Sequence, residues 1–143
     1  MANAPLLSLL LVEDDDVAAE AVTRGLRKHA SDCPVVPAED GVAALQILRG
    51  THGARWIAKP YLVLLDLNMP RMNGFEFLRE LRADKELSGT VVFVLTTSGA
   101  EPDRARAFRE HIAGYMVKSA VGPQCSGLAR FLTEYRAAVQ FHC

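Results

Sequence analysis

Five short apolar runs, separated by segments of helical periodicity, constrain the fold of this chain more than any other feature of its sequence. The runs lie at residues 6–12, 35–36, 61–66, 89–98 and 114–118. Runs that are apolar at nearly every position are typical of strands covered on both faces, as in parallel sheets. Helices usually supply the crossover connections that parallel strands need. The sequence therefore predicts an α/β domain with a parallel sheet and helices on both faces.

Helical periodicity and capping signals indicate a helix after each run. The expected helices cover residues 17–29, 42–48, 75–81, a segment that opens at 101, and 123–139. Asp40 suits the N-cap of the second helix, and Gly50 suits its end. Prolines on both sides of residues 35–36 indicate a strand near the sheet edge. In the loop at residues 51–60, we expect Trp56 to anchor the loop against the domain.

Composition limits the functions that the chain can serve. Its 143 residues are 50% hydrophobic, which is enough for one domain with a real core. A net charge of −1 lacks the basic footprint of a nucleic-acid-binding protein, and no apolar run reaches membrane-spanning length. Three widely spaced cysteines fit a reducing cytoplasm better than a disulfide framework. We therefore expect a cytoplasmic protein with no direct DNA binding and no membrane contact.

Four of the expected strands end in side chains that suit phosphoryl chemistry. These are Glu13 and Asp14 after the first run, Asp66 after the third, Thr96 in the fourth and Lys118 in the fifth. In a parallel sheet such groups converge at one edge, where ligands bind. Clustered carboxylates repel each other unless a cation joins them, and their oxygens suit Mg²⁺. A lysine and a hydroxyl stabilise phosphoryl oxygens. The set therefore predicts a site for Mg²⁺ and a phosphoryl group.

Four segments of the sequence, in this order, resemble the receiver domain of two-component response regulators. They read LLLVEDD, LVLLDLNMPRMNGFEFL, VVFVLTTS and GYMVKS. The resemblance covers essentially the whole chain and implies a single receiver domain over residues 1–143. It implies a flavodoxin-like, doubly wound sheet with strand order 2-1-3-4-5. It also implies a stand-alone regulator that catalyses only its own phosphorylation and dephosphorylation and switches partner binding.

The resemblance assigns the central roles at the site. Asp66 matches the aspartate that accepts a phosphoryl group from the phosphohistidine of a sensor histidine kinase. Glu13 and Asp14 match the acidic pair that binds Mg²⁺, together with Asp66. The backbone carbonyl of Asn68 matches a further protein ligand to this ion.

The remaining roles concern the phosphoryl oxygens and the response to them. Lys118 and Thr96 match the residues that hold these oxygens. Tyr115 matches the aromatic residue whose rotamer follows the movement of Thr96. Asn68 and Ser98 match positions that influence the rate of phosphoryl hydrolysis.

The sequence departs from the family pattern at two positions of the site. Ser119 follows the lysine, where proline is usual and often forms a cis peptide. A cis bond without proline costs about 3 kcal/mol, so we expect a trans Lys118–Ser119 peptide. Glu13 replaces the commoner aspartate, so the metal site has a carboxylate on a longer side chain.

A longer loop at residues 50–60 and the VLTTS segment resemble the single-domain regulators associated with bacterial phytochromes. This implies a phytochrome-type histidine kinase as partner. Such proteins can form homodimers through the region of the last helix. Tyr135, Val139 and Phe141 make the tail a candidate surface for self-association. Alternatively, the tail folds back onto its own domain.

Simpler structural interpretations stay open for several of these residues. Asp15 or Asp16 can serve only as the cap of the first helix. Thr97 is the register alternative to Thr96 as the hydroxyl donor. Tyr115 can be a plain core residue with a solvated hydroxyl.

Two other functions compete with the phospho-acceptor switch. One is a phosphorylation-independent dimeric interaction module, for which Ser119 is the sequence support. The other is a hydrolase of the haloacid-dehalogenase type, which also forms an aspartyl phosphate. That chemistry needs a second aspartate two residues after the nucleophile, where this chain has Asn68.

Overall fold

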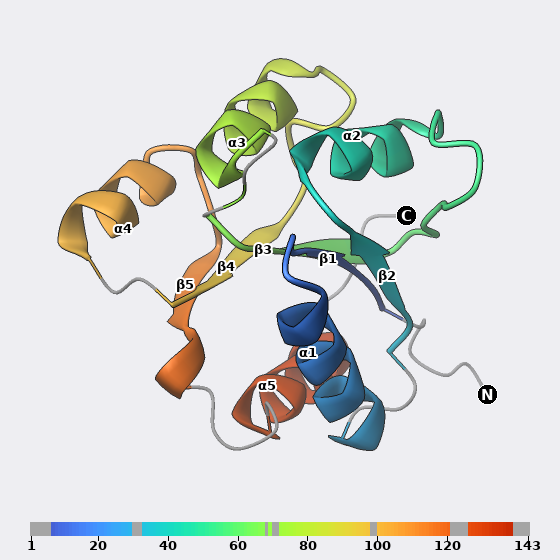
Figure 1. Cartoon of the computed structure of the whole chain (residues 1–143), viewed down its shortest axis with the longest axis vertical. Helices are drawn as coiled ribbons and strands as arrows, with labels where there is room; N and C mark the ends of the chain where they lie inside the picture. Colours follow the sequence, from blue (N-terminus) through green and yellow to red (C-terminus); the bar gives the residue numbers. More distant parts are fainter. Residues whose placement is uncertain are drawn as a thin grey trace.

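A five-stranded parallel sheet forms the centre of the molecule (Figure 1). The computed structural model describes residues 7–29, 33–67, 69, 72–97, 100–120 and 126–138. The strands are β1 (Ser8–Val12), β2 (Val35–Ala38), β3 (Tyr61–Leu65), β4 (Val92–Thr96) and β5 (Gly114–Val117). They pair in the order β2-β1-β3-β4-β5, and every pairing is parallel. The predicted fold class and strand order are confirmed.

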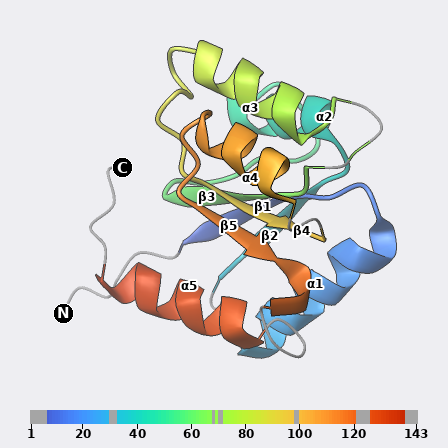
Figure 2. The same ribbon diagram turned by 90° about the vertical axis from the view of Figure 1, so that its left-hand side faces the viewer.

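Helices cover both faces of this sheet (Figure 2). They are α1 (Asp16–His29), α2 (Gly41–Arg49), α3 (Gly74–Ala83), α4 (Glu101–Phe108) and α5 (Ser126–Ala138), with a short 3₁₀ helix, η1 (Lys118–Ala120), after β5. Figure 2 shows α1 and α5 on one face and α2, α3 and α4 on the other. Within the described ranges, each helix is too short or too polar to span a bilayer.

Two apolar cores lie on opposite faces of the sheet. In β1, Leu9 and Leu11 join the core under α1 and α5, whereas Leu10 and Val12 join the core under α2, α3 and α4. Successive strand residues point to opposite faces, so a strand covered twice must be apolar throughout. Full burial of each of these leucines contributes roughly 2 kcal/mol. This explains the continuous apolar runs in the sequence.

Capping residues fix the ends of the helices that lead away from the strands. Asp15 Oδ1 accepts hydrogen bonds from the backbone N–H groups of Val17 at 2.9 Å and Ala18 at 3.2 Å, so Asp15 caps α1. Asp40 caps α2, as predicted, through a 2.8 Å bond from the N–H of Ala43. Gly50 ends α2 in the left-handed region with φ 75°, a conformation that glycine adopts without a steric cost.

Arg55, and not Trp56, fastens the loop between α2 and β3. Trp56 is 71% exposed, so the prediction that it anchors the loop is wrong. Arg55 Nη1 donates to the carbonyl oxygen of Pro37 at 2.7 Å, and Nη2 donates to Glu39 Oε1 at 2.8 Å. These contacts are available because β2 is an edge strand, as its prolines predicted. The guanidinium, with its several donors, takes the role expected of the indole.

The last helix packs on the core through its aromatic residues. The Tyr135 ring lies 5.9 Å from the Phe93 ring, in an edge-to-face arrangement that favours packing. Tyr135 therefore contacts its own domain, as the fold-back alternative expected. Val139 and Phe141, the other residues of the candidate self-association surface, lie outside the described residues, as does Pro123 at the expected helix start.

Candidate functional site

Three carboxylates converge where β1 and β3 end. One carboxylate oxygen from each of Glu13, Asp14 and Asp66 lies within 4.8 Å of the others. The backbone explains this meeting, because Val12 pairs with Leu65 and the Asp66 N–H donates to the Val12 carbonyl at 3.0 Å. The expected convergence of these side chains is therefore present in the structure.

The environment of Glu13 is the most unusual at this edge. Its side chain is only 3% exposed, although it carries an ionisable group. Burial raises the pKa of the Glu13 carboxyl above its ordinary value, and the neighbouring Asp66 carboxylate raises it further. The Lys118 ammonium, whose Nζ lies 2.5 Å from Glu13 Oε1, opposes this rise. Glu13 thus links the acidic cluster to the lysine.

Lys118 and Thr96 reach the same edge from the other half of the sheet. Thr96 is the last residue of β4 and is fully buried, whereas Thr97 is exposed. Thr96 pairs with Val117, the residue before Lys118. Burial at a strand end favours Thr96 over Thr97 as the hydroxyl that serves the site.

The start of α3 approaches the backbone of Asp66 and Leu67 closely. A Cβ atom on Gly74 would lie 2.6 Å from the Leu67 Cα and 2.8 Å from the Asp66 carbonyl oxygen. The Gly74 N–H also donates to the Leu67 carbonyl at 3.0 Å. Only a residue without a side chain fits here, so Gly74 brings the start of α3 against the backbone of the acidic strand end.

A capping box that the sequence prediction missed stabilises the start of α3. The Asn73 side chain accepts from the Glu76 N–H at 3.0 Å, and the Glu76 side chain accepts from the Asn73 N–H at 3.2 Å. The spacing of a short polar residue and a glutamate three positions later was the available signal. Asn68, the expected backbone ligand, lies outside the described residues.

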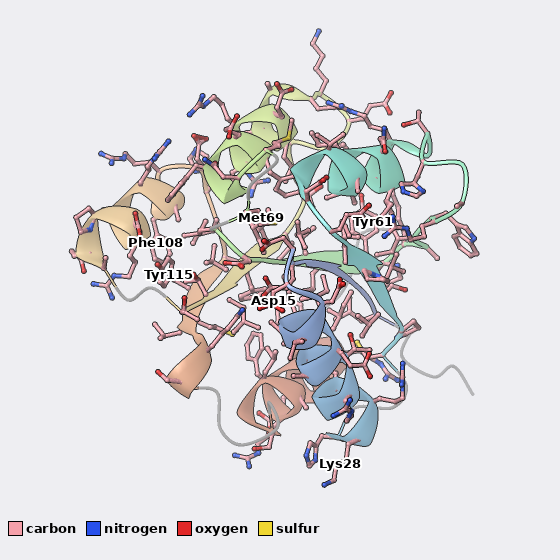
Figure 3. The ribbon with its side chains drawn as sticks, in the orientation of Figure 1. Asp15, Lys28, Tyr61, Met69, Phe108 and Tyr115 are labelled. Carbon is pink, nitrogen blue, oxygen red and sulfur yellow. The ribbon has the colours of Figure 1, made fainter. Side chains whose placement is uncertain are left out.

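Tyr115 lies on β5, on the side of the sheet that α4 covers (Figure 3). It is half-buried and packs against the core under α2, α3 and α4. This position agrees with both interpretations, the switch residue and the partly buried core residue.

The Lys118–Ser119 peptide is trans, as expected, since the cis peptide of the described residues joins Lys59 to Pro60. Ser98 lies outside the described residues.

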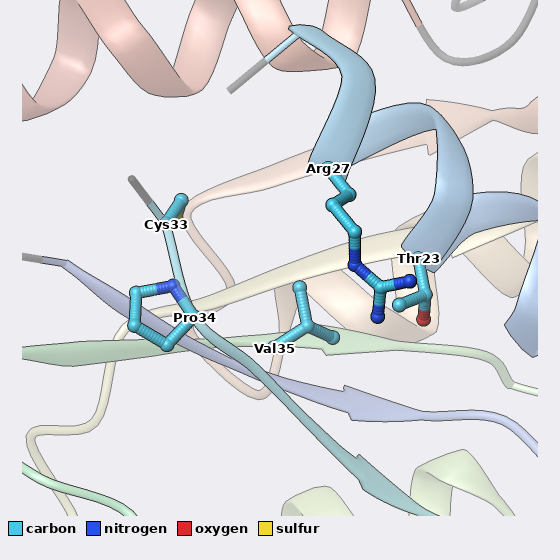
Figure 4. Close-up of a pocket in the computed structure, with 5 residues that line it drawn as sticks. All are labelled: Thr23, Arg27, Cys33, Pro34 and Val35. Atoms are coloured by element: carbon cyan, nitrogen blue, oxygen red, sulfur yellow. The ribbon is translucent and has the colours of Figure 1, made fainter. Parts of the chain in front are cut away.

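A separate cavity of about 300 Å³ lies away from these residues, between α1 and the start of β2 (Figure 4). It is lined by Thr23, Arg27, Cys33, Pro34 and Val35. The Cys33 thiol donates to the Leu7 carbonyl oxygen at 2.8 Å, so its polar group is satisfied. None of the predicted site residues lines this cavity.

The donor set at the strand ends suits a hard cation and a phosphoryl group. Carboxylate oxygens are the ligands that Mg²⁺ binds, often with water completing its octahedron. Glu13, Asp14 and Asp66 supply such oxygens within a small volume. Lys118 adds a positive charge beside them. The site thus combines three carboxylates with the Lys118 ammonium.

Comparisons with known proteins agree with this arrangement. The model of the response regulator receiver domain matches residues 9–124. Response regulator Rcp1 of Synechocystis sp. is 34% identical over 111 residues, which cover 78% of this chain and 76% of Rcp1.

Two solved structures share the fold as well as part of the sequence. The phosphorylated cyanobacterial phytochrome response regulator RcpA is 30% identical, with a TM-score of 0.78, over 94% of this chain and 96% of RcpA. The Mn(2+)-bound form of Rcp1 is 29% identical, with a TM-score of 0.79, over 97% of this chain and all of that one. The chain thus belongs to the family of response regulator receiver domains.

Proposed function

We propose that Asp66 accepts a phosphoryl group from the phosphohistidine of a sensor histidine kinase, in a reaction that depends on Mg²⁺. The observation that carries this proposal is the meeting of three carboxylates with Lys118 at the carboxyl edge of the sheet. Structural acidic residues are usually dispersed, because like charges at close range destabilise each other. A cluster of this kind in a receiver domain is best explained by a bound cation and a phosphoryl acceptor.

The side chains of the cluster have different roles in the proposed reaction. Glu13, Asp14 and Asp66 would hold Mg²⁺, with the Asn68 carbonyl as a further ligand. The bound ion supplies neutralisation of negative charge on the phosphoryl oxygens. Lys118 supplies a second positive charge on the same oxygens.

The phosphoryl transfer depends mainly on how the Asp66 carboxylate is positioned relative to the phosphorus. An Asp66 carboxylate oxygen attacks the phosphorus in line, and the bond from phosphorus to the imidazole nitrogen breaks with its electron pair on the histidine. Water later attacks the phosphorus, the bond from phosphorus to the Asp66 oxygen breaks, and inorganic phosphate leaves as the Asp66 carboxylate is regenerated. In this proposal the chain promotes its own phosphorylation and dephosphorylation.

The switch starts from Thr96, whose hydroxyl would donate to a phosphoryl oxygen on Asp66. Thr96 is buried at the end of β4, so its movement must be passed to the segment that connects β4 to α4. Tyr115, half-buried under the same helix, would turn inward as this segment moves. The altered surface on α4, β5 and α5 then changes the affinity for a partner.

The relatives support a proposal for the partner of this chain. RcpA is a phytochrome response regulator, which supports a phytochrome-type histidine kinase as the donor for this chain. We also propose that residues 1–143 act as one cytoplasmic receiver domain, without direct DNA binding, and that the region of the last helix mediates a homodimer.

Incubation with acetyl phosphate tests the proposed acceptor. In the presence of Mg²⁺, peptide mapping should locate an acid-stable, base-labile adduct on Asp66, and Asp66→Asn should abolish it. Chelation of the metal should abolish it as well. Absence of any adduct in the intact protein would reject the phospho-acceptor function and favour the phosphorylation-independent module.

A further inference from the structure

The indole of Trp56 is 71% exposed, although burial of such a large ring usually stabilises a fold. Trp56 belongs to the connection between α2 and β3, which lies at the periphery of the molecule, outside α2 and β2 (Figure 1). Tryptophan is enriched among the residues that contribute most to protein–protein binding. An exposed indole at this place therefore indicates a contact surface.

The chain on both sides of Trp56 is held in place. Arg55 Nη2 donates to Glu39 Oε1 at 2.8 Å, and the Arg55 backbone N–H donates to His52 Nδ1 at 3.2 Å. On the other side, Ile57 packs against the core under α2, α3 and α4. Because its neighbours are already fixed, Trp56 loses little conformational freedom when a partner covers it.

The charge of the segment that carries Trp56 is positive. Residues 49–60 include two arginines, one lysine and one histidine, and no acidic residue. Acidic side chains from other segments pair with both arginines. Lys59 is exposed, and within the part of the chain that the structure describes it has no ion-pair partner. The partner that suits this surface therefore presents an apolar side chain beside negative charge.

The chain itself carries a surface of this description at the start of α1. Val17 is 79% exposed, and residues 13–20 include five acidic residues and no lysine or arginine. The Val17 N–H donates to Asp15 Oδ1 at 2.9 Å, so the first turn of α1 holds Val17 in place. Asp16 is exposed and, among the described residues, has no ion-pair partner. Since Trp56 and Val17 are both largely exposed, they do not cover each other within one molecule.

Phe108 is the remaining large apolar side chain that is exposed in the described ranges, and it suits the acidic surface less well. It is 47% exposed, less than Trp56. The positive charge of Arg109 beside it is followed directly by the negative charge of Glu110. Exposure and charge therefore favour Trp56 as the side chain that packs on Val17.

We propose that copies of this chain associate head to tail, with Trp56 of one copy packed on Val17 of the next. Lys59 of the first copy then pairs with Asp16 of the second. Such a contact joins two different surfaces, so each copy keeps one of them free and larger assemblies form as the concentration rises. The inference goes beyond the proposed function and does not depend on phosphoryl transfer.

The head-to-tail contact is weak and sensitive to salt. Two apolar side chains bury far less than the roughly 1,200 Å² of a stable interface. Salt screens the attraction between exposed charges, so association falls as the ionic strength rises. Because Val17 follows Asp14 by three residues, a docked copy also stands beside the acidic cluster and restricts access to it.

The first experiment uses the single tryptophan of the chain as the reporter. The fluorescent protein is Val17→Lys, which keeps Trp56 but has lost the acidic surface. The titrant is Trp56→Ala, which keeps the acidic surface and does not fluoresce as an indole. At low salt and millimolar titrant, the Trp56 emission should shift to shorter wavelength and become less accessible to acrylamide.

Two control titrants make this result specific. Trp56→Ala/Val17→Lys lacks both surfaces but keeps the last helix, so it should leave the emission unchanged even if copies associate there. Trp56→Ala/Ala105→Lys adds the same charge at an exposed position of α4 and should still produce the shift. Equal emission with Trp56→Ala and with Trp56→Ala/Val17→Lys would overturn the proposal, as would loss of the shift with Trp56→Ala/Ala105→Lys.

The second experiment exchanges the charges of the pair in the same titration. Lys59→Glu in the fluorescent protein should lower the affinity for the titrant by about threefold, and Asp16→Lys in the titrant should restore it. Lys85→Glu, at an exposed position of the α3–β4 connection, should leave the affinity unchanged. Independent effects of the two exchanges would reject the pairing of Lys59 with Asp16. Neither experiment contains a phosphoryl donor, so both results stand whether or not the chain accepts a phosphoryl group.

Discussion

The carbonyl oxygen of Asp66 lies so close to Gly74 that a Cβ atom there would stand 2.8 Å from it. This distance is shorter than a non-bonded contact of carbon and oxygen allows, and both atoms belong to the backbone. The start of α3 and the proposed acceptor therefore fix each other's position. A change at Gly74 should be felt directly at Asp66.

We predict that Gly74→Ala destabilises the protein by roughly 1–3 kcal/mol, because the added methyl forces the loop backbone to move. It should also slow labelling of Asp66 by acetyl phosphate. Urea denaturation and the labelling rate provide the two measurements. Gly89→Ala is the control, because a Cβ atom at Gly89 meets nothing within 4 Å. Equal stability of the two variants would contradict the prediction.

Arg82 joins the ends of two connections on the α3 and α4 side of the molecule. Its guanidinium donates to the carbonyl oxygens of Ser88, Thr90, Glu110 and His111 at distances of 2.8–3.0 Å. We predict that Arg82→Met lowers the free energy of unfolding by roughly 2–4 kcal/mol, since four carbonyls lose a charged donor.

Amide hydrogen exchange should locate the effect of Arg82→Met. Ala113, whose N–H begins the pairing of β5 with β4, should exchange faster in this variant. Arg79→Met, on an exposed face of the same helix, should leave both the stability and the exchange rate unchanged. Equal exchange in the two variants would show that the turn before β5 does not depend on Arg82.

Thr96→Val should separate phosphoryl transfer from the response to it. The valine preserves the volume of the buried side chain but removes the hydroxyl, so Asp66 should still be labelled while Tyr115 no longer responds. Fluorotyrosine NMR can follow this, with Tyr61 and Tyr135 as internal references. Thr97→Val, at an exposed position, should leave the Tyr115 response intact. The reverse result would assign the switch hydroxyl to Thr97.

The loop that carries Trp56 should respond to acid through Glu39. A hydrogen bond from its own backbone and the Arg55 guanidinium hold the pKa of Glu39 below its ordinary value of 4.5. A lowered folded pKa means that this stabilisation is complete above pH 4.5 and is lost as the pH falls through the lower folded value. Trp56 fluorescence should therefore change on acidification below that pH. In Glu39→Gln this component should be absent; an identical acid transition would contradict the link.

The sequence predicted the sheet because both of its faces are covered, which made each strand a continuous apolar run. It also predicted which side chains would meet, because parallel strands carry their terminal residues to one edge. Glu13, Asp66 and Lys118 are far apart in the chain, yet strand order alone brings them to the same edge.

Other features depend on distances that no local pattern encodes. The pairing of Glu13 with Lys118 depends on the width of two intervening strands and on side-chain length. The four contacts of Arg82 go to backbone carbonyls, which every residue has, so they leave no signature in the sequence. Trp56 does not anchor its loop, because the contacts that hold the loop come from Arg55, which bonds to Pro37 and Glu39.

The edge at β2 has a consequence for assembly. Backbone groups of alternate residues on an edge strand face outward, where the strand of another molecule could dock. At Pro37 the nitrogen has no hydrogen to donate, and its carbonyl oxygen is taken by Arg55. A strand from another molecule would have to displace the Arg55 guanidinium, and Pro37 would still offer it no backbone N–H donor. Pro37 and Arg55 therefore disfavour pairing of a second molecule's strand with β2 at this position.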